Sequence, residues 1–434
     1  MREYTGGDLR RKLLAVSWAM PPLLVPQAIQ ISRILKALSS FDWHTTVLCA
    51  ETAVIDRKLP HDAQLSELTA GSYRTFPVKP PVPLRPLHSH LGYRLLNKLQ
   101  LSNTVWQRWA TRAALGLIKA EDFATLVTFG QPWIDHVIGL DIHRQTGIPW
   151  VAHFSDPWID SPWVNKADRN YPTWCKQEEA TIREADAVIF TTEHTVDLVM
   201  RKYPREYRTK VSVVPHGFDP DVRRFLTRPP EKSRLRMVST GNFYFNRTPI
   251  PLFHALEKLN RAQPLAEVME VILVGPNNVR YAEMAAGMGL GEVVSGHDAV
   301  PFMQSMQIAA GADVLLAIDA PTDGPSVFLP SKLIDYLVLE KPIFGITPLD
   351  GTSADLLRRA DCPVAAPTDI DAITGVVTRL LESWKLGRLG VSPAFAKAAR
   401  DYEIKRTTRV FDTVLRDLTS RGSGAVPPVG NLAG

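Results

Sequence analysis

Two short stretches of the sequence place charged and glycine residues where they could bind an anion. In FLPSKLIDYL, Lys332 and Asp335 are three residues apart and therefore share one face of a predicted helix. A lysine in the first turn opposes the helix dipole, so a negative group bound nearby would explain its position. A diphosphate at Ser331 and Lys332 would supply that charge, and Asp335 would accept hydrogen bonds from ribose hydroxyls. The alternative is an exposed ion pair, which contributes little.

The second stretch, VSTGNFYFNRTP, reads as a strand that ends at Gly241 and Asn242, with Arg247 just ahead of a helix. Glycine allows backbone amides to come close to an anion. Free amides at a helix start favour negative charge, and the arginine side chain matches phosphate oxygens. An ordinary strand-to-helix turn with a surface arginine is the alternative.

Histidine and aromatic residues follow other predicted strands. VAHFSDPWID ends a strand with His153, Ser155 and Asp156, and GQPWIDHVIGL contains His136. Either histidine could contact a substrate, with His153 the first candidate, although a lone histidine more often has a structural role. The next loop contains the aromatic residues Trp158, Trp163, Tyr171 and Trp174. Such rings stack on sugars, lie at a membrane interface or pack in a core.

Short apolar runs alternate with helical patterns along the whole chain, which predicts an α/β fold with parallel sheets. The first series of strands is KLLAVSW, TTVLCA, TLVTFG, PWVAHFS, AVIFTT and VSVVPHG; the second is LRMVSTGN, VMEVILVGP, ADVLLAI, KPIFGI and CPVAA. Ligands of such sheets bind at the carboxyl ends of the strands, where the residues above lie. The predicted organisation is a first domain over 1–218, a linker over 219–235, a second domain over 236–392, a terminal helical segment over 393–420 and a disordered tail over 421–434.

Composition excludes several classes of protein. Hydrophobic residues make up 45% and charged residues 22% of the 434 residues, as in ordinary globular proteins. The three cysteines are far apart, which argues against a disulfide framework or a zinc site and favours a reducing cytosol. No apolar run reaches the roughly 18 residues of a membrane span. The apolar start RRKLLAVSWAMPPLLV is interpreted as a buried strand and not as a signal peptide, because two prolines interrupt it and no small-residue cleavage pattern follows.

The net charge of +5 is modest, but its distribution is uneven. The stretch from Leu68 to Ala120 has no acidic residue and eight basic ones: Arg74, Lys79, Arg85, Arg94, Lys98, Arg108, Arg112 and Lys119. Basic side chains next to Leu and Trp suit an anionic membrane surface. A solvated helix whose apolar side packs on the core would have the same pattern, so both interpretations stay open.

Together, GNFYFNRTP, ILVGP, PFMQSMQIAAGADVLLAI and LPSKLIDYLVLEKPIFGI resemble the group 1 family of retaining, nucleotide-sugar-dependent glycosyltransferases. The resemblance extends over most of the chain and implies a GT-B architecture of two Rossmann-like doubly wound domains facing a cleft. It implies that Arg247 and Lys332 hold the donor diphosphate and that Asp335 replaces a ribose-binding glutamate. It also implies that His153 contacts the donor sugar, that the first domain binds the acceptor, and that the terminal helices pack back toward it.

The expected substrates are a nucleotide-diphosphate sugar and a glycan or lipid-linked acceptor, with no metal, no other cofactor and no nucleic acid. The expected location is the cytoplasm, on the inner face of the membrane if the acceptor is lipid-linked. The sequence departs from the family at Val327, where a glutamate usually contacts the donor sugar, and in PPLLVPQ, which lacks the usual glycine pair. The alternatives are an epimerase or phosphorylase of the same architecture, a non-catalytic scaffold and a membrane-surface binding module.

Overall fold

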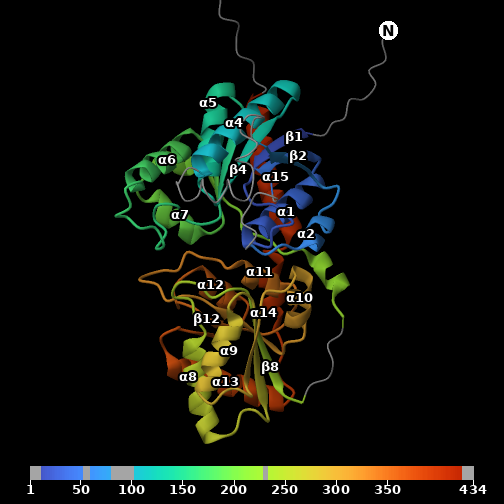
Figure 1. The fold of residues 1–434 in the computed structure, drawn as a ribbon, viewed down its shortest axis with the longest axis vertical. Helices are drawn as coiled ribbons and strands as arrows, with labels where there is room; N and C mark the ends of the chain where they lie inside the picture. Colours follow the sequence, from blue (N-terminus) through green and yellow to red (C-terminus); the bar gives the residue numbers. More distant parts are fainter. Residues whose placement is uncertain (1–10, 52–58, 80–101, 228–232, 423–434) are drawn as a thin grey trace, which may run out of the picture.

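The computed structural model describes residues 11–51, 59–79, 102–227 and 233–422, and shows two α/β domains arranged along the long axis of the molecule (Figure 1). The strands of the first domain are β1 (Arg11–Val16), β2 (Trp43–Ala50), β3 (Arg74–Val78), β4 (Thr125–Gly130), β5 (Trp150–Phe154), β6 (Ala187–Phe190) and β7 (Val211–Val213). Its helices are α1 (Pro26–Ser39), α2 (Ala63–Glu67), α4 (Ser102–Ala120), α5 (Ile134–Thr146), α6 (Tyr171–Glu184), α7 (Glu193–Met200) and the 3-10 helices η2 (Arg205–Lys210) and η3 (Pro220–Phe225).

The strands of the second domain are β8 (Leu235–Thr240), β9 (Met269–Val274), β10 (Val294–His297), β11 (Val314–Ile318), β12 (Ile343–Ile346) and β13 (Val364–Ala365). Its helices are α8 (Ile250–Ala262), α9 (Asn278–Gly287), α10 (Phe302–Ala310), α11 (Ser331–Leu337), α12 (Thr352–Arg359), α13 (Ile370–Lys385) and α14 (Pro393–Arg400), and α15 (Ile404–Gly422) follows. The second sheet begins at Leu235, inside the predicted linker, and α15 extends two residues beyond the predicted end of the helical segment at 420.

Both sheets are parallel and have the strand order of the Rossmann fold. The first sheet runs β3-β2-β1-β4-β5-β6-β7 and the second runs β10-β9-β8-β11-β12-β13. In each sheet the order reverses between the first and fourth strands, and the crevice at the carboxyl ends there is the usual ligand site. The predicted fold class of two Rossmann-like doubly wound domains is therefore confirmed.

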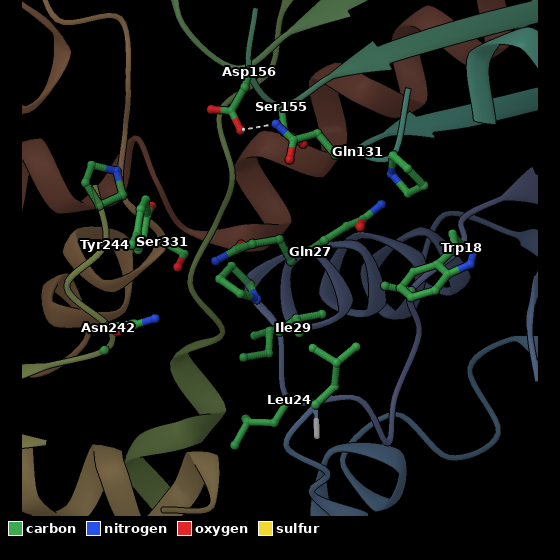
Figure 2. A pocket seen from close by; sticks show the side chains of 18 of the residues that line it. Trp18, Leu24, Gln27, Ile29, Gln131, Ser155, Asp156, Asn242, Tyr244 and Ser331 are labelled. Carbon is green, nitrogen blue, oxygen red and sulfur yellow. Dashed lines mark hydrogen bonds between the residues drawn. The ribbon is translucent and has the colours of Figure 1, made fainter. Parts of the chain in front are cut away.

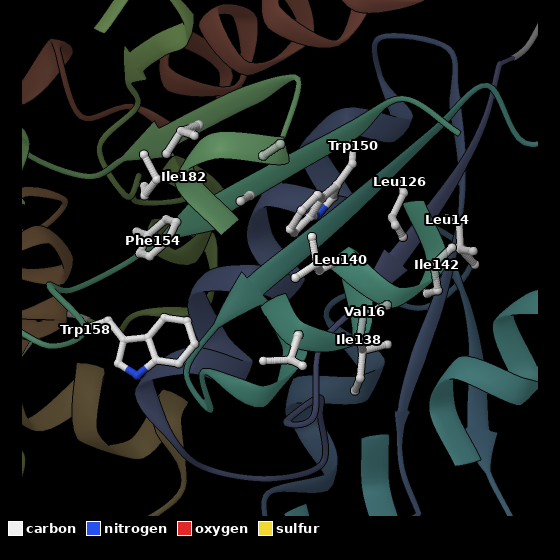
Figure 3. Packing of buried hydrophobic residues seen from close by; sticks show 14 of the residues in the cluster. Leu14, Val16, Leu126, Ile138, Leu140, Ile142, Trp150, Phe154, Trp158 and Ile182 are labelled. Carbon is white, nitrogen blue, oxygen red and sulfur yellow. The ribbon is translucent and has the colours of Figure 1, made fainter. Parts of the chain in front are cut away.

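Each sheet is buried on both faces, which explains the nearly continuous apolar runs of its strands. In β1, Leu14 and Val16 belong to the core on one face, and Leu13 and Ala15 to the core on the other. Figure 3 shows the first of these cores, in which Leu14 and Val16 pack with residues of β4, β5 and α5.

The chain crosses between the domains twice, and the two crossings lie side by side. The backbone amide of Phe218 donates to Tyr402, and the amide of Ile404 donates to Phe218, both over 2.9 Å. The two helices of the predicted terminal segment therefore belong to different domains. Helix α14 packs on α12 of the second domain, while α15 packs on α1 and β4 of the first. In Figure 1, α15 runs back through the first domain. Within the described ranges, no helix is long and apolar enough to cross a membrane.

Candidate functional site

A cavity of about 1230 Å³ lies between the domains, at the carboxyl edges of both sheets. Residues at both points where the strand order reverses line this cavity. In the first domain these are Trp18 and Gln131, just after β1 and β4, and in the second domain they are Gly241 and Asp319, just after β8 and β11. Figure 2 shows the side chains around it, with Gln27 and Ile29 of α1 opposite Ser331 and Asn242 of the second domain. Both domains therefore contribute to one site.

Arg247 lies in this cavity and is held by two neighbours. Its Nη2 is 3.1 Å from Oδ1 of Asp319, and its Nη1 donates to the hydroxyl of Tyr244 over 3.1 Å. Its guanidinium also stacks 4.7 Å above the ring of Tyr244. Within the described chain its Nε is buried and unpartnered. The guanidinium group of Arg247 is thus fixed in place, and its Nε–H group can still donate a hydrogen bond to an anion.

Lys332, in the first turn of α11, is buried in the same cavity. Its Nζ has no hydrogen-bond partner among the described residues and lies 5.3 Å from the ring centroid of Phe243. Burial, followed by the positive charge of Arg247, lowers the pKa of Lys332 to about 7, while Asp319 acts in the opposite direction. With this pKa the buried amine is only partly protonated at neutral pH. A bound anion would raise the pKa and so favour the charged form of Lys332.

Asp335 also lines the cavity, but its carboxylate is already engaged across the domain boundary. Its Oδ1 accepts a hydrogen bond of 2.5 Å from Nη1 of Arg33 on α1. The side chains of Asp335 and Arg33 are only 12% and 8% exposed, so this is a buried ion pair. Asp335 therefore joins the domains as well as facing the cavity.

The predicted residues Gly241, Asn242 and Ser331 all line the cavity beside Lys332. Gly241 has a φ of 92°, in the region that favours glycine. Gly275 packs against it so closely that a Cβ at 275 would lie 2.3 Å from the carbonyl oxygen of Gly241. The Oδ1 of Asn242 is buried and unpartnered within the described part of the chain. The β8–α8 turn thus presents polar groups at a fixed position.

The structure does not place His153 or His136 in the lining of the cavity. His153 is fully buried against Phe129 and Phe411, and burial holds its pKa well below the usual value. His136 is also fully buried, and its Nδ1 lies 2.8 Å from Oγ1 of Thr128. Both have the surroundings of core histidines.

His216, in the VVPHGFD segment, lines the cavity instead, with its ring centroid 5.7 Å from that of His153. Its Nδ1 is unpartnered among the described residues, and burial lowers its pKa to about 4. Gln27 and Gln30 also line the cavity, and both amide atoms of Gln30 are buried without a partner in the described chain. Sequence reasoning missed these three residues, although PQAIQ begins the helix that follows β1 and VVPHG begins at the end of β7.

Asp156, at the end of β5, faces Arg247 from the first domain. Burial raises the pKa of Asp156 to about 6, while the positive charge of Arg247 acts to lower it. Its Oδ2 accepts a hydrogen bond of 3.3 Å from Gln131, which Figure 2 shows. The carboxyl group can therefore change protonation state close to neutral pH.

Val327 does not line the cavity, although Ser326 and Phe328 on either side of it do. Its carbonyl oxygen instead accepts hydrogen bonds from the hydroxyls of Thr192 and Thr195 across the domain boundary. The acid nearest to Arg247 in this part of the site is Asp319. No group of three or more His, Cys, Asp or Glu side chains among the described residues could hold a metal ion.

Part of the basic stretch lies in α4. Trp106, Ala110 and Ala114 of this helix are buried in the first core, while Arg108 and Arg112 are exposed. The apolar side of α4 therefore packs on the protein. Arg85, Arg94, Lys98, Leu95, Leu96 and Leu99 lie outside the described residues.

Comparison with known proteins agrees with this geometry. Residues 27–217 match the model of the Glycosyl transferase 4-like domain. Sucrose-phosphate synthase from Thermosynechococcus elongatus has a similar structure, with a TM-score of 0.68, 14% identity, and coverage of 95% of this chain and 100% of that one. No curated protein matches the sequence.

Two further structures share the fold. WaaG, a glycosyltransferase involved in lipopolysaccharide biosynthesis, has a TM-score of 0.57 at 14% identity, with 95% of this chain and 100% of that chain covered. A UDP-N-acetylglucosamine 2-epimerase has a TM-score of 0.55 at 12% identity, with 98% and 99% covered. Residues 27–217 are therefore similar to a Glycosyl transferase 4-like domain, and the chain as a whole has the two-domain fold of the GT-B glycosyltransferases.

Proposed function

We propose that the protein transfers a glycosyl group from a nucleotide-diphosphate sugar to a hydroxyl group of an acceptor. The observation that carries the proposal is the pair of buried cationic side chains, Arg247 and Lys332, at the reversal point of the second sheet. The amine of Lys332 has no partner in the described chain, and both side chains line the same cavity as Gly241 and Asn242. A diphosphate is the anion that fits two such groups beside a strand-to-helix turn.

In the reaction, the bond from the sugar anomeric carbon to the diphosphate oxygen breaks, and a bond to the acceptor oxygen forms. Negative charge grows on the leaving diphosphate, and preorganised cations there lower the barrier. Arg247 is held by Asp319 and Tyr244, so it need not reorganise during the reaction. The acceptor proton passes to the leaving phosphate in a same-face attack. Such a reaction retains the anomeric configuration, as in the family that the sequence resembles, and requires no metal.

A thermal-shift panel of UDP-, GDP- and ADP-sugars tests the donor class. A ligand at about 100 times its dissociation constant stabilises the folded protein by about 2.7 kcal/mol. The sugar with the cognate nucleotide should therefore raise the melting temperature more than the others. Stabilisation by none of the nucleotide sugars or free nucleoside diphosphates would refute the proposed donor site.

Lys332→Ala and Arg247→Ala are each expected to reduce kcat/KM strongly, because each removes a charge that stabilises the leaving group. The loss for one such donor is typically about 2.7–4 kcal/mol in the barrier. Lys258→Ala and Arg261→Ala are matched controls, since both side chains are exposed on α8 and outside the cavity. Initial rates with the identified donor measure the effect, and parent-like rates in both cavity variants would exclude the assignment.

An epimerase acting on the same donor is the second candidate, because a UDP-N-acetylglucosamine 2-epimerase shares this fold over nearly the whole chain. Such an enzyme needs no acceptor. Incubating the protein with the stabilising nucleotide sugar alone distinguishes the two: an epimerase converts the sugar, whereas a transferase leaves it largely intact until an acceptor is added.

We also propose that the protein works at the inner surface of a membrane when its acceptor is lipid-linked. The exposed Arg108 and Arg112 on α4 support this, because each basic residue near an anionic surface contributes about 1 kcal/mol. Vesicle co-sedimentation should then require anionic lipid and decrease with added salt. Equal binding to neutral vesicles, or binding to neither kind, would show that this surface is not used.

A further inference from the structure

Indole rings line the first-domain half of the cavity together with aliphatic and polar side chains. Of the ten tryptophans in the sequence, seven line the cavity, and all seven belong to the first domain. Six of them are Trp18, Trp106, Trp109, Trp133, Trp158 and Trp174. The seventh, Trp163, stacks at 4.5 Å on Phe245 of the second domain. We call the six rings the tryptophan pocket.

The pocket has rigid walls. The fully buried Asp135 accepts a 2.7 Å hydrogen bond from Nε1 of Trp106 and a 2.8 Å hydrogen bond from the backbone amide of Trp18. Trp133 and Trp158 stack with their ring centroids 5.4 Å apart and their planes only 12° apart. The rings of Trp106, Trp133 and Trp158 are thus held by contacts within the protein. An apolar surface that enters such a preformed site gains the hydrophobic free energy without first ordering the protein.

Charge divides the cavity into two unlike halves. The second domain contributes Arg247 and Lys332, whereas no lysine or arginine of the first domain lines the cavity within residues 11–51, 59–79 and 102–218. The ionisable acids on the first-domain side are Glu51 and Asp156. Lys79, which does not line the cavity, lies 3.7 Å from a carboxylate oxygen of Glu51. Among the described lining residues of that half, a phosphate or carboxylate group would therefore meet acids and no cation, which is unfavourable.

The volume also suits two substrates. A site for one small ligand is typically about 300–1,000 Å³, and this cavity is about 1230 Å³. The polar groups that remain in the first-domain half are neutral ones such as Gln131, Ser155 and Gln177. They can hydrogen-bond a few hydroxyl groups while the indoles cover the remaining surface.

We infer that the tryptophan pocket is the acceptor subsite and that it selects an uncharged acceptor with a large apolar body, such as a glycoside of a hydrophobic alcohol, in preference to a sugar phosphate. This inference rests on the proposed function, since it identifies the second substrate of the same site. The apolar body would lie on the indoles, and the hydroxyl to be glycosylated would point toward Arg247 and Lys332.

Three probes test the inference on the unmodified full chain: hexyl β-D-glucoside, methyl β-D-glucoside and glucose 6-phosphate. Binding is measured by calorimetry and by the intrinsic fluorescence of the tryptophans. Hexyl glucoside is expected to bind at least tenfold more tightly than methyl glucoside, because it buries several more methylene groups. Glucose 6-phosphate is expected to bind more weakly than either.

Trp109→Ala should remove most of the preference for hexyl over methyl glucoside. Trp384→Ala is the matched control, because Trp384 is a half-buried tryptophan in α13, away from the cavity. Equal affinities for the two glucosides, tighter binding of glucose 6-phosphate, or no saturable binding of hexyl glucoside would overturn the inference. Those results would not refute the proposed donor site, since the nucleotide-sugar panel tests that site without an acceptor.

Discussion

At the scale of single residues, the site is defined by polar atoms that folding buries without a partner. A buried polar group without a hydrogen bond is costly, and native proteins keep few of them unless they serve a function. In the described chain, the unpartnered atoms of Gln30, His216, Asn242 and Lys332 all belong to residues that line one cavity. Their convergence indicates a polar ligand that completes the missing hydrogen bonds.

The lysine at the centre of this group predicts a pH dependence. Because the pKa of Lys332 is about 7 in the ligand-free protein, the amine is charged below that pH and neutral above it. A bound diphosphate raises this pKa, so the affinity for a nucleoside diphosphate should fall as the pH rises through 7, by at most about tenfold per pH unit.

Lys332→Arg is the control for this prediction, because a guanidinium stays charged throughout that range. Calorimetric titrations from pH 6 to 9 in the parent and the variant measure the difference. If both proteins lose affinity in parallel, the dependence comes from the ligand and not from Lys332.

The buried pair of Arg33 and Asp335 predicts separate effects on stability and binding. Asp335→Asn should raise the KM for the donor more than it lowers kcat, because the side chain becomes a weaker acceptor for ribose hydroxyls. It should also destabilise the fold by about 3–5 kcal/mol, since a buried arginine loses its partner.

A second change separates the two roles of Asp335. The double variant with Arg33→Gln should regain much of the stability, because no unpaired charge remains, but should keep the high KM. Urea denaturation and steady-state kinetics on the single and double variants provide the measurement. A KM that returns to the parent value in the double variant would mean that Asp335 acts only as an interdomain tie.

At the scale of elements, the turn between β8 and α8 is shaped by the packing of two strand ends. The loop after β9 supports the turn after β8, with Nδ2 of Asn278 donating to the carbonyl oxygen of Gly241 over 3.2 Å. Glycine at 275 is what allows this close approach, and its φ is 149°. The position of the proposed anion site in the second domain thus depends on the neighbouring segment around Gly275 and Asn278, which contributes no charged group to this contact.

Gly275→Ala tests this dependence. Its Cβ would lie 2.3 Å from the Gly241 oxygen, so the turn must shift, at a cost of roughly 1–3 kcal/mol in stability and with weaker donor binding. Gly287→Ala is the matched control, because a Cβ there meets nothing within 4 Å. Melting temperatures and nucleotide titrations check both effects, and similar behaviour of the two variants would contradict the proposed support.

At the scale of the whole molecule, the two domains are joined by more than their connecting segment. The chain returns from the second domain through α15, which packs on the first sheet with Phe411 and Leu415 in its core. On this helix Asp412 accepts a 2.7 Å hydrogen bond from Nε1 of the buried Trp43. The C-terminal helix α15 is therefore part of the first domain, whose core is built from segments on both sides of the second domain in the sequence.

Phe411→Ala is expected to destabilise the first domain by about 3–5 kcal/mol, because it leaves a cavity beside Phe129 and His153. Val410→Ala, at an exposed neighbouring position, should change stability by less than about 0.5 kcal/mol. Thermal unfolding followed by near-ultraviolet circular dichroism measures both. A similar small effect of the two substitutions would mean that α15 is not needed for that core.

What the sequence determined by itself was the repeated βα pattern and several of the residues after its strands that line the cavity, such as Gly241 and Arg247. Runs such as TTVLCA and AVIF are apolar because both faces of their strands are buried, and this local signal was enough to predict them. The edge strands β3 and β10 were missed, because RTFPV and VSGH contain proline or glycine and are partly exposed. Such strands are held by pairing with a neighbour and have no strong apolar pattern of their own.

Only the tertiary structure decided which residues meet in the cavity. Arg33 and Asp335 are 302 positions apart, so their ion pair exists only because the domains face each other. His153 looked suitable at a strand end, but the side chains of a strand alternate between faces, and the fold turned this one toward Phe411 while His216 reached the cavity. The tryptophans also meet only in the folded chain: Trp18, Trp133 and Trp158 follow parallel strands whose carboxyl ends lie at one edge, while Trp106, Trp109 and Trp174 reach the cavity from α4 and α6.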